Sequence, residues 1–251
     1  MFATLKAEFR KLLTVRSTYA IILFMLALEG IFAFWANGYK VSAPQLAQHD
    51  FLMRNIFDGV SALATFPAIV AVLLMSHEYR YNTIMHSLTL SPSRLRVLFS
   101  KVLVVSVYAV IITAAFAAIT LGLTELGLHL GHHHMVAQTL PFHRLVLQVL
   151  FYGWGMALAG LLIASLLRNQ IASVVSLLVL PGIIEQLLSL LLKSKTIYLP
   201  FTALGQVIEN HPTSSDIHHV LTPIHAAEVF LVWLVVGWII SAILFVRRDA
   251  N

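Results

Sequence analysis

The stretch Ser76–Lys101, SHEYRYNTIMHSLTLSPSRLRVLFSK, is a polar and basic segment between two strongly apolar ones. It contains a short helix-like piece, a proline at position 92 between two serines, and a basic run that leads into the next apolar segment. The other long segments of the chain are apolar enough to lie in a membrane. The stretch therefore separates two membrane spans, and its function depends on what it contacts on its own side of the membrane.

Composition places the whole chain in the membrane. Of its 251 residues, 59% are hydrophobic and only 11% are charged, and the mean hydropathy is +0.87. A soluble domain of this length carries about a quarter charged residues, so the expected fold is a single all-α polytopic domain over residues 1–251. The net charge of +5 does not indicate nucleic-acid binding, because the basic residues are scattered between apolar segments. The chain has no cysteine, which excludes disulfides, thiolate metal sites and cysteine nucleophiles.

Six apolar segments are long enough to cross a bilayer, which takes about 20 residues per helical span. We place the spans at Thr18–Ala36, Phe57–Met75, Val102–Leu123, Leu145–Leu167, Ile171–Leu192 and Ala227–Val246.

The N-terminal residues 1–16 are too polar to form a span, and their pattern predicts an amphipathic helix. Apolar residues recur there at spacings of three and four, with charged residues between them. The apolar positions are Phe2, Leu5, Phe9, Leu12 and Leu13, and the polar face holds Lys6, Glu8, Arg10 and Lys11. Such a helix is suited to lie in the plane of the lipid headgroups.

The distribution of lysine and arginine sets the orientation. If the N-terminus is cytoplasmic, eleven of the 16 cationic residues lie on the cytoplasmic side, as the positive-inside rule requires. Both termini and the segment 76–101 are then cytoplasmic. The longest outer connection is 193–226, and its first half, TIYLPFTALGQVIEN from Thr196, is too apolar for an ordinary loop and too short to span. We expect a re-entrant or interfacial element there.

Several catalytic signatures are missing from the sequence. It contains no GxxxxGK[ST], the loop that holds the phosphates of ATP, and neither HExxH nor GxSxG. An energy source for transport must then be an ion gradient or a separate protein.

Histidine is common, with twelve residues in all, and four of them form an HxxHH pattern. Imidazoles at this spacing are able to bind iron or zinc. Because the charge distribution puts the pattern on the outer side, a solvated loop is the favoured interpretation and a metal site the alternative. The four histidines are His129, His132, His133 and His134.

Carboxylates inside predicted spans are costly and normally face a cavity or a partner. Glu185 is the most deeply placed, and it follows Pro181-Gly182, a pair that loosens the helical hydrogen bonding. One hypothesis is that Glu185, with Gln186 and Ser189, lines a translocation path. The equally weighted alternative is a structural carboxyl with internal hydrogen bonds. Glu29 in the first span is a second, weaker candidate for the path.

These features in combination resemble the permease subunits of type 2 ABC exporters. The resemblance runs over essentially the whole chain and rests on motifs that are specific only together. They are EFRKLLTVRSTY from Glu8, Glu78-Tyr-Arg80, Thr83-Ile84, Leu88, Ser91-Pro-Ser-Arg94 with Lys101, LPFTALGQVI from Leu199, and Val246-Arg-Arg-Asp-Ala at the end. Asn82 stands where many relatives have glycine; asparagine is the next residue best able to take a left-handed conformation.

The resemblance implies a multi-pass subunit of a bacterial plasma membrane that is not itself an enzyme and carries no cofactor. It implies pairing with a second permease copy or paralogue, and docking of two separate ATP-binding subunits that hold ATP and Mg²⁺. Residues 1–16 would be the elbow helix, 76–101 the coupling loop, and Leu199–Asn210 a re-entrant hairpin within the outer segment 193–226.

The residues of the loop agree with a coupling role. Tyr81, Ile84, Met85 and Leu88 give a short helix one apolar face for a partner cleft, and Glu78 beside Arg80 is placed to hold loop to span by an ion pair. The family pattern adds Thr83 and Arg94, although Arg94 also fits the positive-inside rule alone.

Two functions of other classes remain open at this point. One is an ion-coupled secondary transporter with Glu185 as its proton carrier, and the other is an intramembrane metalloenzyme built on the histidines. For an ABC exporter the apolar walls favour an amphipathic or lipid-like substrate.

Overall fold

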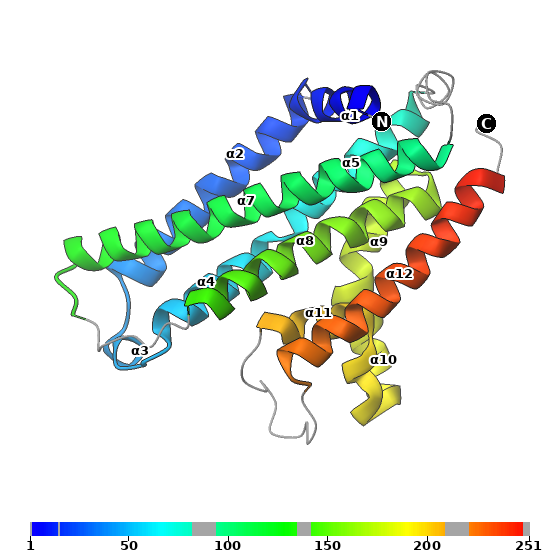
Figure 1. Cartoon of the computed structure of the whole chain (residues 1–251). Coiled ribbons are helices and arrows are strands. Elements are labelled where there is room, and N and C mark those ends of the chain that lie inside the picture. Colours follow the sequence, from blue (N-terminus) through cyan, green and yellow to red (C-terminus); the bar gives the residue numbers. More distant parts are fainter. Residues whose placement is uncertain (1, 15, 82–93, 135–141, 209–220, 248–251) are drawn as a thin grey trace.

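The computed structural model describes residues 2–14, 16–81, 94–134, 142–208 and 221–247, and the described elements are helical. Figure 1 shows their arrangement as a bundle of long helices. In chain order the first elements are α1 (Phe2–Thr14), α2 (Arg16–Ile31), the π-helical η1 (Phe32–Tyr39), α3 (Ala43–Leu46), α4 (Phe51–Leu63), α5 (Thr65–Arg80) and α7 (Arg94–Leu130). They are followed by α8 (Phe142–Leu167), α9 (Gln170–Val179), the π-helical η2 (Leu180–Ile184), α10 (Glu185–Leu192), the 3-10 helix η3 (Lys193–Tyr198), α11 (Pro200–Ile208) and α12 (Pro223–Arg247).

The predicted fold class is confirmed. Within the described residues, six helical segments are long and apolar enough to cross a membrane. They are Thr18–Tyr39, Phe51–Arg80, Leu95–Leu130, Phe142–Leu167, Gln170–Tyr198 and Pro223–Arg247. Each contains or overlaps one predicted span, and the largest differences are at the second and third spans. The start of α1 and the end of α12 lie at the same end of the bundle (Figure 1); we call this end the loop end, because residues 82–93 also connect α5 to α7 there.

The third span is a helix of 37 residues, about 55 Å long at 1.5 Å per residue. A hydrocarbon core is about 30 Å thick, so α7 extends beyond it. Hydropathy recognises only the apolar middle of such a helix. The predicted boundaries Val102 and Leu123 are therefore several residues inside the observed ones.

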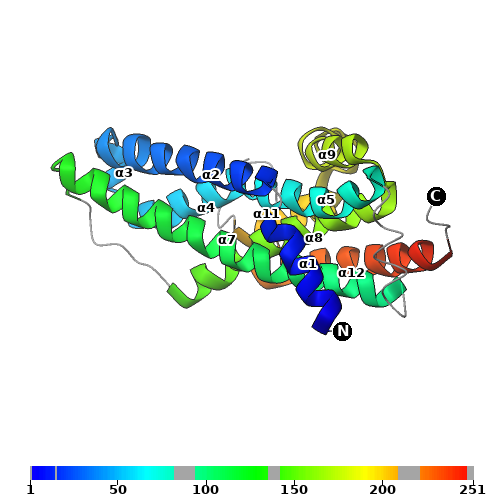
Figure 2. The same cartoon turned by 90° about the horizontal axis from the view of Figure 1, so that it is seen from above.

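α1 is a separate helix that lies across the loop end of the bundle, as Figure 2 shows from above. The amphipathic helix predicted for residues 1–16 is confirmed at Phe2–Thr14. One detail of that prediction is wrong. Glu8 is buried together with Leu12, because it stands three residues after Leu5 and four before Leu12, on the face that meets the bundle.

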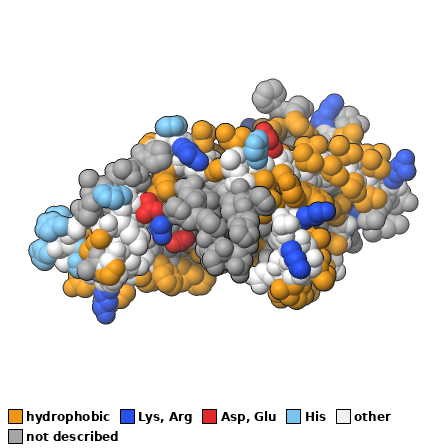
Figure 3. Space-filling model, turned by 90° about the horizontal axis from the view of Figure 1, so that it is seen from below, with side chains coloured by type: hydrophobic (Ala, Val, Ile, Leu, Met, Phe, Trp, Pro, Cys, Tyr) orange, Lys and Arg blue, Asp and Glu red, His pale blue; other side chains and the backbone are white. Residues whose placement is uncertain are grey.

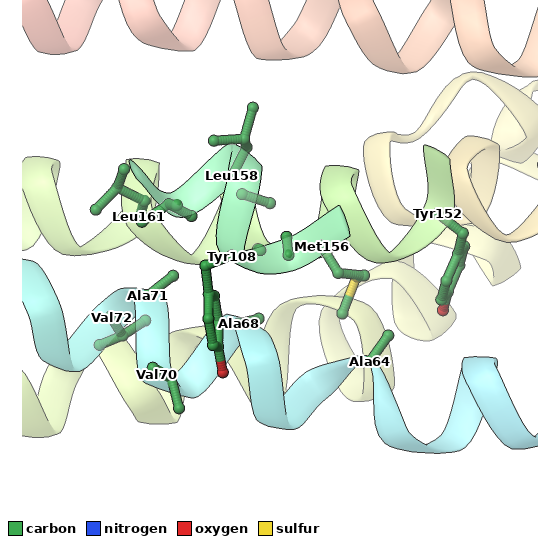
Figure 4. Close-up of a cluster of buried hydrophobic side chains, with 14 of the residues drawn as sticks. Ala64, Ala68, Val70, Ala71, Val72, Tyr108, Tyr152, Met156, Leu158 and Leu161 are labelled. Carbon is green, nitrogen blue, oxygen red and sulfur yellow. The ribbon is translucent and has the colours of Figure 1, made fainter. Parts of the chain in front are cut away.

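The core of the bundle is formed where α5, α7 and α8 pack together. Figure 4 shows the side chain of Tyr108 of α7 directed toward α5, between Val72 on one side and Ala68 on the other, with Leu161 and Met156 of α8 also in view. Small residues of α8 allow this close packing.

The glycines of α8 each receive a neighbour from the same chain. A side chain at Gly160 would meet the carbonyl oxygen of Ala68 at 2.6 Å, and one at Gly153 would collide with Thr113. A side chain at Gly155 would meet the ring of Phe230 at 2.8 Å. The small-residue pattern of the fourth span therefore serves packing within the subunit.

Candidate functional site

Four charged side chains meet at the loop end, where α1, α5 and α7 come together. Lys101 of α7 is completely buried and donates to Glu8 Oε2 of α1 at 2.6 Å and to Glu78 Oε1 of α5 at 2.7 Å. Lys11 of α1 donates to Glu8 Oε1 at 2.7 Å and to the same Glu78 Oε1 at 2.5 Å. Each carboxylate thus contacts two ammonium groups and each ammonium two carboxylates. We call Glu8, Lys11, Glu78 and Lys101 the charge cluster.

The charge cluster is balanced, with two positive and two negative groups. Isolated ions of this kind would be expensive to bury, and here each is compensated by two hydrogen-bonded counter-ions. Glu8 and Glu78 are 1% and 4% exposed, whereas the Lys11 side chain keeps 38% of its surface. Burial alone would lower the pKa of Lys11, but the hydrogen bonds and charges of Glu78 and Glu8 outweigh it and raise the pKa above its ordinary value. Lys11 is thus firmly cationic.

The charge cluster links the two helices that flank residues 82–93. Glu78 lies four residues before Asn82 and Lys101 lies eight after Ser93, so α5 and α7, the helices before and after residues 82–93, are joined by one buried ion pair. Through Glu8 the same ion pair is fixed to α1. Glu78 forms ion pairs with Lys11 of α1 and Lys101 of α7, and its role in coupling stays a prediction.

The two residues after Glu78 contact a different part of the bundle. The guanidinium of Arg168, in the turn between α8 and α9, lies 5.3 Å from the ring centre of Tyr79. Arg80 donates to the Gln170 side chain at 3.0 Å. Arg168 has a φ of 54° and ends α8, while the side chain of Asn169 caps α9 by accepting from Ala172 N–H at 3.0 Å.

Three consecutive residues of α5 are thus attached to three different neighbours. Glu78 is bound to α1 and α7, Tyr79 contacts the end of α8, and Arg80 is bound to the start of α9. A displacement of the chain directly after Arg80 would be passed to all of them.

The remaining predicted coupling residues are only partly described. Tyr81 is 63% exposed, and the Arg80 guanidinium lies 5.5 Å from its ring centre. Thr83, Ile84, Met85 and Leu88 lie outside the described residues, as does the side chain of Arg94, the first residue of α7. The apolar face formed by Ile84, Met85 and Leu88 stays a prediction.

Glu185 makes the contacts expected of a structural carboxyl. It is buried at the start of α10 and accepts from the backbone N–H groups of Phe201 at 2.8 Å and Thr202 at 2.6 Å. It also accepts from the Thr202 hydroxyl at 2.7 Å. These groups are the unpaired donors of the first turn of α11, where a carboxylate is favourable. Gln186 and Ser189 are not hydrogen-bonded to Glu185; Ser189 donates to the Gln186 carbonyl at 2.6 Å. A role of the three in a translocation path stays a prediction.

α11 is held at its other end as well. Gln148 of α8 donates to the carbonyl of Val207 at 2.7 Å, and both residues are buried. The outer segment predicted to be re-entrant thus contains η3 and α11, and α11 packs on α8 and α12. The re-entrant hairpin within this segment stays a prediction.

Glu29 is buried inside the bundle, 5% exposed. It is hydrogen-bonded to the Thr120 hydroxyl of α7, and a side chain added to Gly59 of α4 would meet its Oε1 at 2.6 Å. These contacts place the Glu29 side chain of the first span against α4 and α7. Its role in a path stays a prediction.

The four histidines of the HxxHH pattern lie at and beyond the end of α7. Figure 3 shows histidine side chains gathered at one end of the molecule as seen from below. His133 contacts the carbonyl of Tyr39 at 3.1 Å. In the described part of the chain, no three His, Cys, Asp or Glu side chains come close enough together to hold a metal ion. A metal site at His129, His132, His133 and His134 stays an alternative prediction.

Sequence reasoning missed three members of the charge cluster. Glu8 and Lys11 were assigned to the polar face of the first helix, and Lys101 to the positive-inside pattern. A usable signal exists in retrospect, since Glu8 shares its helical face with Leu5 and Leu12. Nothing in the sequence pairs position 8 with position 101.

Comparison with known protein families matches residues 4–184 to a family described as ABC-2 family transporter protein. The match contains most of α1, the charge cluster and the first four spans, and it extends through η2. A search among curated proteins returns no significant match. The matched residues make up well over half of the chain, and the six apolar helices agree with a multi-pass membrane subunit. The chain belongs to the ABC-2 transporter family and is a permease subunit of an ABC transporter.

Proposed function

We propose that this permease subunit works in an ATP-driven exporter, and that residues 76–101 receive the movement of separate ATP-binding subunits on the cytoplasmic side. The observation that carries the proposal is the charge cluster, which joins α5 and α7, the helices on either side of residues 82–93, to α1. A contact surface that must pass force to the membrane spans needs such a rigid support.

The transmission follows from the contacts. Closure of the partner subunits displaces residues 82–93, and the ion pairs of Glu78 and Lys101 carry α5, α7 and α1 along as one body. The Arg80–Gln170 hydrogen bond and the Arg168–Tyr79 contact extend this movement to α9. We infer that α9 moves together with α5, and that this joint movement opens a path at the interface with a second permease copy.

ATP chemistry belongs to the partner in this proposal. The sequence contains no phosphate-binding loop of the GxxxxGK[ST] type, so ATP and Mg²⁺ are assigned to the ATP-binding subunits. The apolar faces of the spans favour an amphipathic substrate such as a drug, a peptide antibiotic or a lipid.

The test is co-expression of the tagged chain with the ATP-binding subunit encoded next to it, followed by copurification and ATPase assay. We expect the partner to copurify with the unaltered chain. The double substitution Ile84→Asp and Leu88→Asp should remove the partner or uncouple its ATPase from transport, because it places two charges on the predicted contact face.

The matched control is Lys193→Asp with Lys195→Asp, two exposed residues at the other end of the bundle. It introduces the same two side chains and should leave partner binding unchanged. If no ATP-binding subunit copurifies with the unaltered chain, and no ATPase activity depends on residues 79–89, the proposal fails.

A further inference from the structure

A cavity of about 410 Å³ lies beside the charge cluster, between α1, the start of α2 and the loop-end half of α5. Its size falls within the range of small-molecule pockets, roughly 300–1,000 Å³. The coupling role proposed above uses the cluster and the loop but not this cavity.

One wall of the cavity is a single face of α5 that changes from apolar to polar along the helix. The lining positions recur at spacings of three and one, which is the pattern of one helical face. They are Val70, Leu73, Leu74, His77, Glu78 and, just past the end of the helix, Tyr81. From the first to the last of them is about 16 Å along the axis. The half with the lower residue numbers is purely apolar, and the half nearer the loop end is polar.

The opposite wall is formed by α1 and the start of α2. Leu12 of α1 and Thr18 of α2 complete the lining together with Lys11. Because α1 is an amphipathic helix suited to the headgroup plane, the polar end of the cavity lies at headgroup level and the apolar end at the level of the acyl chains. A ligand that matches this arrangement is an amphiphile whose head faces Lys11 and Tyr81 and whose tail lies along Val70 and Leu73.

The charges around the cavity indicate which head group the amphiphile carries. Glu78 lines it, but both ammonium groups of the charge cluster bind that carboxylate, and its side chain is only 5% exposed. Lys11 keeps 38% of its side-chain surface, and Arg16 and Arg80 nearby are exposed. Positive charge is therefore the accessible charge at this end, and it favours an anionic head.

We propose that this cavity binds one acyl chain of an anionic lipid taken from the leaflet on the side of α1. The site does not depend on ATP or on the partner subunits, so its test is separate from that of the proposed transport function. Lipid in this position would fill the space between α1 and α5.

The experiment uses the full chain in nanodiscs of phosphatidylcholine. The probe is a lysophosphatidic acid with a photoactivatable diazirine in its acyl chain, compared with a trimethylammonium amphiphile that carries the same chain. Mass spectrometry then locates the labelled peptides. We expect labelling of the α5 peptide around residues 70–77 and of the α1 peptide, with the anionic probe favoured over the cationic one.

Filling the cavity is the decisive variant. Leu73→Trp should weaken labelling of these peptides about tenfold or more, because excluding two methylene groups of the tail already costs that factor. Leu23→Trp is the matched control, since Leu23 is 65% exposed on α2 and does not line the cavity. If Leu73→Trp fails to elute as a folded protein in gel filtration, Leu74→Phe replaces it.

A second substitution tests whether the cavity prefers an anionic head group. Removing the charge of the exposed Arg16, two residues before the lining Thr18, by Arg16→Gln should reduce the preference for the anionic probe about fivefold, since one cation near an anionic lipid contributes about that factor. Equal labelling of Leu73→Trp and Leu23→Trp would overturn the site. Equal labelling by both probes would overturn the anionic head.

Discussion

Replacing Lys101 with methionine tests whether the charge cluster holds the loop end together. The side chain is completely buried and is bound to Glu8 and Glu78. Methionine preserves most of the volume but leaves two buried carboxylates with Lys11 as their remaining partner in the charge cluster. Breaking a buried ion pair on one side costs about 3–5 kcal/mol, so we expect the free energy of unfolding to fall by that amount.

The rest of the charge cluster supplies internal comparisons. Lys11→Met should cost less, about 1–2 kcal/mol, because the Lys11 side chain is 38% exposed and partly screened by water. Lys101→Met combined with Glu78→Gln leaves the balanced pair Glu8–Lys11. Its cost should be smaller than the sum of the two single substitutions by about 1–3 kcal/mol, the coupling expected of residues in one network.

The assay is unfolding of the purified chain in mixed micelles with increasing sodium dodecyl sulfate, followed by far-ultraviolet circular dichroism. Lys195→Met is the control, because that side chain is exposed at the far end of the bundle and such substitutions stay within about 0.5 kcal/mol. A loss below about 1 kcal/mol for Lys101→Met, or strictly additive costs in the double substitution, would show that the charge cluster does not stabilise the loop end.

Three further outcomes follow from the same structure. Glu185→Leu should lower stability by about 1–2 kcal/mol through loss of the α11 cap, and full transport in both this variant and Glu185→Gln would remove the residue from the path. Gly160→Val should cost about 1–3 kcal/mol or more by overpacking against the Ala68 carbonyl, whereas Gly182→Ala, where a side chain meets open space, should be nearly neutral by the same unfolding assay. The pKa of Lys11 is raised on folding. Its contribution to the free energy of unfolding is therefore complete below its unfolded pKa of about 10.4 and is lost as pH rises through the higher folded pKa. In a thermal-unfolding series from pH 7 to 11.5, stability should show no loss from Lys11 until the alkaline end.

Much of the fold follows from composition and hydropathy, because a spanning helix must satisfy its own backbone and be apolar for about 20 residues. The fourth span ends at Leu167 in both the prediction and the structure. The second span begins six residues earlier than predicted, at Phe51. Arg54 and Asp58 make that stretch look like a loop, whereas their side chains lie on the exposed side of an otherwise apolar helix.

The site was harder to predict because its geometry is long-range. Glu78 was predicted to take part in coupling from its place before the loop, but its ion-pair partners are 67 and 23 positions away. Hydropathy treats Lys101 as the last polar residue before a span. Only packing shows that its ammonium group points into the bundle and meets α1.

The choice of ions for this junction is itself informative. Buried ion pairs are poor sources of stability, and apolar residues of similar volume often stabilise as well or better. Two carboxylates and two ammonium groups add directional contacts. Their hydrogen bonds of 2.5–2.7 Å fix the three helices to one another at defined atoms. An apolar contact would allow α1, α5 and α7 to slide past one another under load. The charge cluster therefore suits a junction that must move as one body, and this is the property that a coupling loop between Glu78 and Lys101 requires.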